Sequence, residues 1–390
     1  MGKIEPAMYK RIGIVTGGGD APGLNAVIRA VVKTAVCEFG MRVFGIEDGY
    51  EGLLGETRIR ELGAADVRGL LPRGGTILGT RNRGRFSERN SEGIAVNPEA
   101  VYNEALGSLE KLGIEGLVVV GGEGTLTIAA EFDRLGLPVL GVPKTIDNDL
   151  ACTELTFGFA TALDIATEAL DRLHTTAESH DRVMILEVMG RHAGWIALHS
   201  GIAGGADVIL IPEIPFSMQS VADKVGSRED AGSKFSIMVV AEGAREVDHE
   251  LIYQDKGDAY YAPRLGGIGV YCRAQLEELT GKETRCVVLG HLQRGGRPNA
   301  FDRMLATSFG ACAVRAFAHG EKGVMVALQA ADVVTVPISE AITNTKTIPP
   351  NGQMVRTARD TGISFGAPDE IAYHKTIELC TPLTSIDCQG

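Results

Sequence analysis

Glycine and acidic residues occur together at two places in the sequence where a phosphate group could bind. Residues 17–23 read GGGDAPG and residues 121–125 read GGEGT. Glycine lets the backbone approach a ligand closely, and a following helix N-terminus favours anions. Tight turns are the alternative for either loop alone, but two such loops favour a binding role. Neither loop has the spacing G-x-x-x-x-G-K-[ST] or G-x-G-x-x-G, which disfavours ordinary P-loop and Rossmann sites.

A third segment, PKTIDND at residues 143–149, places two carboxylates close to a lysine and a threonine. Two carboxylates in a crevice are costly unless a cation or a proton transfer uses them. An exposed turn with Asx hydrogen bonds is the alternative. The segment follows another apolar run, so we expect Asp147 and Asp149 to act in a site.

Several arginines stand beside the ends of apolar runs: Arg182, Arg191, Arg285 and Arg294, the last with His291 nearby. The planar guanidinium group suits phosphate oxygens. Any one of them alone would be a surface ion pair. Together they indicate a site for a doubly phosphorylated ligand, or for a phosphate and a nucleotide.

The elements that must position these residues are short buried strands alternating with helices. Such β-branched runs are typical of parallel strands covered on both faces. Apolar residues with helical spacing follow at 24–36, with Gly40 as the stop, and at 162–173. This alternation predicts a doubly wound α/β protein whose ligands bind at the strand ends. The expected strands include residues 12–15, 117–120, 139–142, 183–186, 208–211, 237–241, 287–289 and 324–328.

Composition excludes several classes of protein. Of 390 residues, 50 are glycine without a three-residue period, 44% are hydrophobic, and the net charge is −12. This excludes a collagen and a disordered chain, and it argues against a nucleic-acid partner. No apolar stretch reaches ~18 residues and no secretory signal is visible, so we expect a cytoplasmic protein without a membrane partner. Seven scattered cysteines without metal-ligand spacing fit a reducing compartment.

Six motifs, taken in order, resemble the 6-phosphofructokinase family over residues 11–320. The motifs are GGGDAPGLNAVIR (17–29), GGEGT (121–125), PKTIDND (143–149), EVMGRHAGW (187–195), AEGA (241–244) and GHLQRGG (290–296). The resemblance implies two similar doubly wound, mainly parallel-sheet α/β domains with the active site in the cleft between them. The donor-binding domain would comprise 1–158 plus 293–343. The sugar-phosphate-binding domain would comprise 159–292 plus 344–390, including a C-terminal extension.

The implied activity is phosphorylation of fructose 6-phosphate at its 1-hydroxyl, giving fructose 1,6-bisphosphate in glycolysis. By resemblance, Asp147 is the catalytic base, Thr145 and Gly18 hold the transferring phosphoryl group, and Arg191 neutralises its charge. Glu123 and Asp149 would hold Mg²⁺. The donor would meet Gly18, Arg81, Asn82, Arg83, Gly122, Glu123, Gly124, Thr125 and Lys144. The sugar phosphate would meet Thr145, Asp147, Arg182, Met189, Gly190, Arg191, Glu242, Arg285, His291 and Arg294.

The resemblance also implies a homo-oligomer, a dimer or tetramer, because the family supplies the counterparts of Arg182 and Arg285 from a neighbouring subunit. Surface insertions at 81–97 and 245–267, together with the C-terminal tail, indicate a longer subgroup that contains members using ATP and members using pyrophosphate.

Two positions depart from the family pattern, and a further pair of positions combines the patterns of two groups of members. Glu123 replaces the usual Asp, and Asn82 stands where an Arg is common, so that Arg81 or Arg83 would serve the phosphate. Pyrophosphate-using members typically have Asp at 124 and Lys at 144, whereas ATP-using short bacterial members have Gly at both. This chain has Gly124 and Lys144. Gly124 leaves room for a nucleotide α-phosphate, so ATP is the expected donor and pyrophosphate the alternative. A NAD or lipid kinase and a catalytically inactive regulatory subunit are weaker alternatives.

Overall fold

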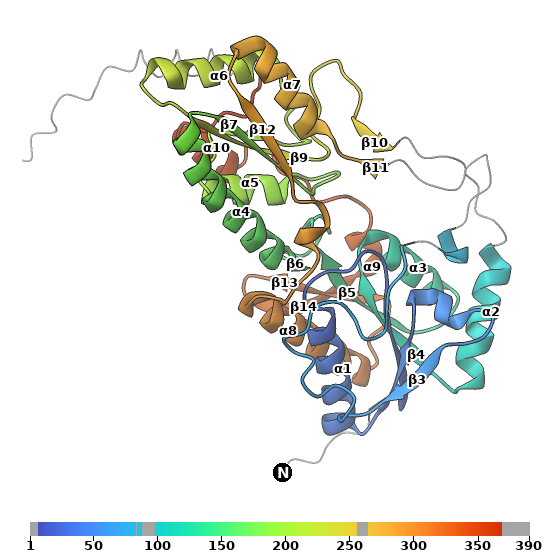
Figure 1. Ribbon diagram of the computed structural model, residues 1–390. Helices are drawn as coiled ribbons and strands as arrows, with labels where there is room; N and C mark the ends of the chain where they lie inside the picture. Colours follow the sequence, from blue (N-terminus) through green and yellow to red (C-terminus); the bar gives the residue numbers. More distant parts are fainter. Residues whose placement is uncertain (1–6, 83, 88–97, 256–263, 369–390) are drawn as a thin grey trace, which may run out of the picture. The chain divides into compact units, whose positions relative to one another are not determined.

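A computed structural model describes residues 7–82, 84–87, 98–255 and 264–368 (Figure 1). The chain divides into two compact units: 1–165 with 291–346, and 166–290 with 347–390. We call these unit 1 and unit 2. The divisions fall after Ile165, Gly290 and Lys346, where the sequence led us to expect 158, 292 and 343. The donor and sugar-phosphate roles of the two units stay predictions.

Unit 1 contains a mainly parallel sheet in the strand order β14-β13-β5-β4-β1-β2-β3. The central strands pair in parallel, and the outer pairs β2–β3 and β13–β14 are antiparallel. A short further strand, β6, pairs with β5. The bounds are β1 Arg11–Thr16, β2 Arg42–Ile46, β3 Ile59–Leu62, β4 Gly116–Gly121, β5 Val139–Thr145, β6 Phe157–Gly158, β13 Val324–Gln329 and β14 Asp332–Pro337.

Helices cover both faces of this sheet, because its strands are apolar on both sides. Ile12 and Ile14 of β1 belong to one buried cluster, with α1 (Leu24–Phe39) and α8 (Ala300–Ala318), which lie side by side in Figure 1. Val15 belongs to the opposite cluster, with α2 (Pro98–Lys111), α3 (Glu123–Arg134) and α9 (Ile338–Ala341). The predicted helix at 24–36 and its stop at Gly40 are confirmed, since Gly40 caps α1 with a φ of 63°.

The chain reverses its direction of winding between β1 and β4, which are neighbours in the sheet. From β1 it passes through α1 to β2 on one side, whereas from β4 it passes through α3 to β5 on the other. The loops at the carboxyl ends of β1 and β4 therefore open a crevice at this point, which is where open α/β sheets bind ligands.

Unit 2 contains a four-stranded sheet in the order β12-β7-β9-β8, with every pair parallel. Helices α6 and α7 share one buried cluster with the sheet. Ile209 points to the opposite face, where a Cβ at Gly201 of α5 would lie 2.5 Å from its Cδ1. The bounds are α4 Phe159–His180 (which spans the division at 165), β7 Val183–Val188, α5 Trp195–Ala203, β8 Val208–Leu210, α6 Met218–Asp230, β9 Ser236–Ala241, β10 Tyr253–Asp255, β11 Arg264–Leu265, α7 Ile268–Thr280, β12 Thr284–Val288 and α10 Gln353–Asp360.

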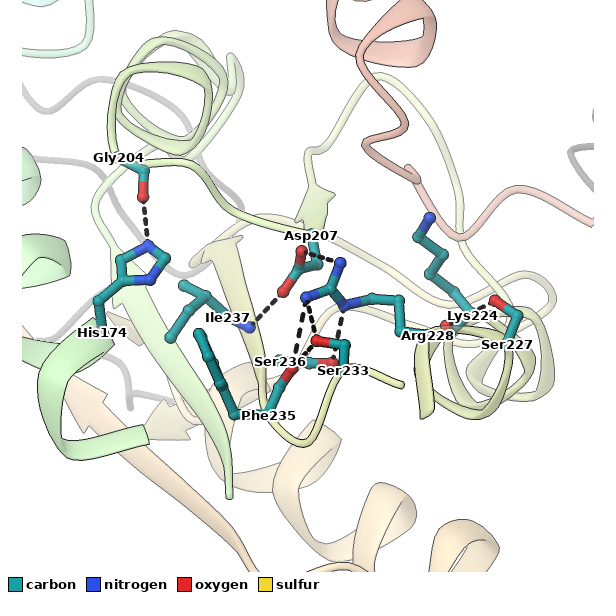
Figure 2. Close-up of polar contacts among 10 residues, drawn as sticks. All are labelled: His174, Gly204, Asp207, Lys224, Ser227, Arg228, Ser233, Phe235, Ser236 and Ile237. Atoms are coloured by element: carbon teal, nitrogen blue, oxygen red, sulfur yellow. Dashed lines mark hydrogen bonds and ion pairs between the residues drawn. The ribbon is translucent and has the colours of Figure 1, made fainter. Parts of the chain in front are cut away.

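An ion pair holds α6 to the amino-terminal edge of the unit 2 sheet (Figure 2). Arg228 Nη1 lies 2.7 Å from Asp207 Oδ1, and Asp207 Oδ2 accepts the backbone N–H of Ile237 at 2.8 Å. Arg228 Nη2 also donates to Ser233 Oγ at 2.9 Å. Because Asp207 precedes β8 and Ser233 and Ile237 lie just before and at the start of β9, the network lies at the opposite edge from the loops that follow the strands.

All eight predicted strands are confirmed by β1, β4, β5, β7, β8, β9, β12 and β13. Strands β2, β3 and β14 were not predicted from the sequence. These strands include charged or polar residues, such as the Arg60–Glu61 pair in β3, and so do not form continuous apolar runs. The segments 83, 88–97, 256–263 and 369–390, which contain parts of both predicted insertions and of the tail, lie outside the described residues.

Candidate active site

A pocket of about 250 Å³ lies at the carboxyl ends of β1, β4 and β5 in unit 1. It therefore occupies the crevice at which the chain reverses its winding. Both glycine loops line it together with Lys144 and Thr145 at the end of β5. The lining residues are Gly17, Gly18, Gly19, Tyr50, Glu51, Arg81, Asn82, Gly84, Phe86, Gly122, Glu123, Gly124, Thr125, Ile128, Lys144, Thr145 and Arg294.

The two glycine loops approach each other closely, because Thr125 of the second loop packs against Gly17 of the first. A Cβ at Gly17 would lie 2.6 Å from Thr125 Cγ2, and one at Gly121 would lie 2.4 Å from the same atom. A side chain at Gly17 would therefore push the loops after β1 and β4 apart, and one at Gly121 would clash with Thr125 within its own loop. Tyr50 holds the same turn, since its hydroxyl donates to the Thr125 carbonyl oxygen at 3.0 Å.

Helix α3 begins at the wall of this pocket. Gly122 is its N-cap and Glu123 its first residue, and Gly122 to Thr125 all line the pocket. The first backbone N–H groups of a helix have no partner within the helix and carry partial positive charge. This part of the pocket can therefore bind phosphate oxygens.

The backbone N–H of Gly18 is already engaged in this structure. It donates to the Arg81 carbonyl oxygen at 3.1 Å, and the Thr80 hydroxyl donates to the Gly18 carbonyl oxygen at 2.6 Å. A phosphoryl group could use the Gly18 N–H only after residues 80–81 shift. The Arg81 side chain is exposed and lies 3.9 Å from the Asp48 carboxylate. Arg83 lies outside the described residues.

Lys144 and Arg294 bring positive charge to the loop after β1. The Lys144 ammonium group donates to the Gly19 carbonyl oxygen, and Arg294 Nη1 donates to the Asp20 carbonyl oxygen at 3.1 Å. Lys144 is only 3% exposed. Burial, with the nearby Arg294 charge, lowers the pKa of Lys144 to about 8. Arg294, which we expected at the sugar phosphate, thus lies among the predicted donor-binding residues.

The predicted base stands in a tight turn after β5. The backbone N–H of Asp147 donates to Thr145 Oγ1 at 3.1 Å, and the next residue, Asn148, has a left-handed φ of 52°. Asn148 is buried, and its Oδ1 accepts the Thr156 N–H at 3.1 Å. The Thr156 hydroxyl donates to the Thr145 carbonyl oxygen at 2.7 Å. These bonds hold the backbone on either side of Asp147.

Sequence reasoning missed the apolar wall of the pocket. Tyr50, Phe86 and Ile128 supply it, and Tyr50 packs on Phe86 with ring centroids 5.4 Å apart. Tyr50 follows β2 within a short 3-10 helix (Gly49–Leu53), and Phe86 lies in another (Arg85–Ser87) inside the polar insertion. Phe86 is an isolated aromatic residue in the charged insertion, and this could have indicated that it contacts a ligand or the core. Such a wall can accept the flat apolar face of a ring.

In unit 2 the loops after the neighbouring strands β7 and β9 pack backbone to backbone. The Glu242 N–H donates to the Val188 carbonyl oxygen at 2.9 Å, and the Gly243 N–H to the Gly190 carbonyl oxygen at 3.1 Å. A Cβ at Gly243 would lie 2.1 Å from the Arg191 carbonyl oxygen. The structure thus brings Met189, Gly190, Arg191 and Glu242 to one edge of this sheet, with Arg191 exposed.

Arg182 and Arg285 converge on a single carboxylate. Arg182 Nη2 lies 2.8 Å from Glu283 Oε1, and the Arg285 guanidinium also bonds to Glu283. The pKa of Glu283 is lowered, mainly by the hydrogen bond from Arg182. His291, the first residue of unit 1 after the division at Gly290, is exposed in a 3-10 helix (Gly290–Gln293), and its carbonyl oxygen accepts the Arg294 N–H at 3.0 Å.

The predicted metal carboxylates differ in exposure. Glu123 is exposed at the pocket wall, whereas Asp149 is half-buried in the turn beyond Asp147. Over the described ranges, no three or more His, Cys, Asp or Glu side chains cluster so as to hold a metal ion. Mg²⁺ commonly takes only one or two carboxylates and completes its shell with water and substrate phosphates. Two carboxylates are therefore a sufficient donor set for that ion.

A family model described as phosphofructokinase matches residues 11–317. The chain belongs to the phosphofructokinase family. It is 58% identical over 358 residues to a Chloroflexus aurantiacus protein named ATP-dependent 6-phosphofructokinase, covering 92% of this chain and 98% of that one. It is also 51% identical over 359 residues to the Streptomyces coelicolor pyrophosphate–fructose 6-phosphate 1-phosphotransferase, covering 91% of this chain and all of the relative. Family members named for either donor thus resemble the chain closely.

Solved structures of the family share the fold. Pichia pastoris phosphofructokinase in the T-state matches with a TM-score of 0.75 at 34% identity, over 92% of this chain and 37% of that one. This agrees with two α/β units built on mainly parallel sheets. Among the helices of the described residues, none is both long and apolar enough to cross a membrane.

Proposed function

We propose that the protein transfers a phosphoryl group from ATP to the 1-hydroxyl of fructose 6-phosphate, with Mg²⁺, giving fructose 1,6-bisphosphate. One observation carries the proposal. A single pocket at the reversal point of the unit 1 sheet combines a helix N-terminus, Lys144, Arg294 and an apolar wall. A nucleotide triphosphate has the matching parts, because it joins an anionic chain to a flat ring.

In the proposed reaction Asp147 accepts the proton of the sugar 1-hydroxyl as the hydroxyl oxygen forms a bond to the donor's terminal phosphorus. The bond from that phosphorus to the bridging oxygen breaks, and the leaving phosphate keeps the electron pair. General-base assistance of this kind contributes about 10²–10⁴-fold. The hydrogen bond from the Asp147 N–H to Thr145 Oγ1 supports this role, because it orients the turn that carries the carboxylate.

Charge on the transferring group would be balanced by Arg191 and by Lys144. Arg294 would stiffen the loop after β1 through its bond to the Asp20 carbonyl oxygen. Preorganised positive groups of this kind usually provide a large part of the acceleration in phosphoryl transfer. Thr145 and the Gly18 N–H would contact the same group once residues 80–81 have moved.

Mg²⁺, when bound, would neutralise charge on the phosphate oxygens of the donor. Glu123 and Asp149 would hold it through carboxylate oxygens, which are the ligands that this hard cation prefers. The exposure of Glu123 fits a metal that arrives with the nucleotide.

Two features of the pocket favour ATP over pyrophosphate. A Cβ at Gly124 would meet no atom within 4 Å, so glycine leaves open space beside the helix N-terminus. Pyrophosphate has no ring, and so has no group that could pack on the apolar wall of Tyr50, Phe86 and Ile128. Lys144, which the resemblance associates with pyrophosphate, would contact a phosphate of either donor.

We also propose that the active form is a homo-oligomer in which Arg182 and Arg285 reach the sugar phosphate of a neighbouring subunit. Val287 and Val288, on the same strand as Arg285, are 38% and 52% exposed. A subunit contact would cover these valines. Co-expression of Asp147→Asn and Arg285→Ala chains tests this. If Arg285 acts in the site of a neighbouring subunit, a mixed oligomer contains sites with both Asp147 and Arg285 intact, and activity returns. If Arg285 acts within its own subunit, no such site forms and activity stays low.

The donor assay tests the main proposal. Formation of fructose 1,6-bisphosphate from fructose 6-phosphate is measured with aldolase-coupled detection, using either ATP or pyrophosphate with Mg²⁺. We expect turnover with ATP. Turnover with pyrophosphate and none with ATP would show that pyrophosphate is the donor. No product with either donor would reject the proposed reaction.

A further inference from the structure

Lys346, at the end of unit 1, contacts the turn that carries the proposed base. Its Nζ donates three hydrogen bonds of 2.9 Å each, to Asn148 Oδ1 and to the carbonyl oxygens of Thr153 and Glu154. An ammonium group has three N–H bonds, so these three acceptors match its full donor capacity. Lys346 lies beyond residues 11–317, which the family model matches.

The backbone of Lys346 reinforces the contact. Its N–H donates to the Asp149 carbonyl oxygen at 2.8 Å, and Thr345 pairs with Leu150 in an antiparallel bridge. Residues 345–346 therefore run alongside residues 149–150. This pairing brings the Lys346 side chain to the turn and does not depend on that side chain.

Asn148 connects Lys346 to the two carboxylates of the turn. It stands between Asp147 and Asp149, is 3% exposed, and has a φ of 52°. Its Oδ1 accepts from both Lys346 and Thr156, and its Nδ2 donates to the Glu154 carbonyl oxygen at 3.4 Å. These side-chain bonds tether Asn148 and so restrain the backbone that sets the directions of both carboxylates.

The rest of the loop is attached independently of Lys346. The Glu154 N–H donates to the Leu328 carbonyl oxygen at 2.9 Å, and the Leu328 N–H donates to Thr153 Oγ1 at 3.0 Å. These bonds join the loop to β13. Loss of the Lys346 ammonium group would therefore leave the loop attached to the sheet and would leave Asn148 Oδ1 with the Thr156 N–H as its donor.

We propose that Lys346 is a positioning residue of the phosphoryl-transfer site. Through Asn148 it holds the turn of residues 147–149, so that the Asp147 carboxylate faces the acceptor hydroxyl and the Asp149 carboxylate faces the cation. The inference rests on the proposed function, because it assigns the two carboxylates their roles. A half-buried ammonium serves this purpose because it binds one side-chain and two backbone acceptors at a single point.

Lys346→Met tests the proposal, since methionine keeps most of the chain length and removes the donors. Lys322→Met, at an exposed lysine of the same unit, is the matched control. The measurements are kcat, KM for fructose 6-phosphate, the melting temperature, and Mn²⁺ binding in the presence of ADP by electron paramagnetic resonance. For Lys346→Met we expect kcat to fall at least tenfold and Mn²⁺ affinity to fall severalfold, with KM for the sugar within twofold. The control should match the wild type.

A double-mutant cycle with Asn148→Gly separates positioning from general stability. Glycine adopts the left-handed φ of Asn148 but cannot accept from Lys346. We expect the two substitutions to be non-additive in kcat, because both break the hydrogen bond between Lys346 and Asn148. Rescue by Lys346→Arg, even in part, would support the proposal.

Wild-type kcat and Mn²⁺ affinity in Lys346→Met would overturn the inference. So would additive losses in the cycle, or a fall in kcat that only follows a fall in melting temperature. If Lys346→Met does not fold, Asn148→Gly alone gives the same readout. An inactive wild-type enzyme would instead reject the proposed function, so the two failures are distinguishable.

Discussion

The ammonium group of Lys144 donates a hydrogen bond to the carbonyl oxygen of Gly19, in the loop that follows β1. This bond joins the carboxyl end of β5 to that of β1, although β4 lies between the two strands in the sheet. It places a buried positive charge beside the glycine loops, where the phosphates of the donor are expected.

The first prediction concerns the pH dependence of donor use. Burial lowers the pKa of Lys144 to about 8. Lysine is charged below its pKa, so phosphate attraction is present below pH 8 and is lost as the pH rises through that value. We expect kcat/KM for the donor to fall above pH 8. Because the folded-state pKa lies below the unfolded value, this group favours folding increasingly as pH rises from about 8 to 10.5.

Steady-state kinetics between pH 6.5 and 9.5 check this for the wild type and Lys144→Met. The variant should have a lower kcat/KM throughout, without the fall near pH 8. An unchanged fall in the variant would assign the titration to another group.

The second prediction concerns Gly124. Its open surroundings mean that Gly124→Asp adds a carboxylate without a steric clash, and an acidic residue in the first turn of α3 is favourable. Two negative charges about 4 Å apart repel by about 4 kcal/mol at an effective dielectric constant of 20. Because 1.36 kcal/mol corresponds to a factor of ten in rate, we expect kcat/KM for ATP to fall by up to about 10³-fold, with little change in melting temperature.

Gly124→Asn is the matched control, because the amide has the same shape without the charge. It should lose less ATP activity than Gly124→Asp. Equal losses would mean that volume and not charge decides donor access, and ATP kinetics unchanged in both variants would contradict the role given to Gly124.

The third prediction concerns Asp147. Replacing it with asparagine removes the proton acceptor at nearly constant volume, so kcat should fall by about 10²–10⁴-fold. Binding of fructose 6-phosphate should stay close to that of the wild type. The chain has one tryptophan, Trp195, at the start of α5 and four residues after Arg191. Its fluorescence should report sugar-phosphate binding in both proteins, and retained turnover in the variant would exclude Asp147 as the base.

The fourth prediction concerns stability at the edge shown in Figure 2. The Arg228 and Asp207 side chains are only 26% and 12% exposed. Arg228→Ala leaves the Asp207 carboxylate without its ion pair, which we expect to cost about 2 kcal/mol, less than for a fully buried pair. The control is Arg172→Ala, which breaks a surface pair with Glu168 and should cost about 0.5 kcal/mol or less.

Urea unfolding at two pH values measures how the loss of unfolding free energy in Arg228→Ala depends on pH. Burial raises the pKa of Asp207, and loss of Arg228 raises it further. Protonation then removes the unpaired charge, so the deficit of Arg228→Ala should shrink as pH falls. A deficit that grows in acid would contradict this account. The kinetic constants should be unchanged, because the pair lies at the opposite edge of the sheet from Met189 and Glu242.

Much of the fold and of the candidate site is visible in local spacing. The run at 117–120 predicts β4, and the glycines after it predict a loop that opens onto a helix N-terminus. Both depend on residues a few positions apart, which is why they can be inferred without the fold. Strands with charged residues, such as β3, could not be inferred from the sequence. An edge strand leaves one side open to solvent and therefore does not need an apolar run.

By itself, the sequence determined the parallel strands, the turns at their ends and the family of motifs that these turns carry. Only the tertiary structure decided which ends meet. Lys346 reaches Asn148 across 198 positions, and Arg294 reaches Asp20 across 274. Tyr50, which belongs to the apolar wall, donates a hydrogen bond to the Thr125 carbonyl oxygen in the first turn of α3, 75 positions away. The physical reason is strand order: β1 lies between β2 and β4, and the spacing of residues along the chain does not encode which strands become neighbours.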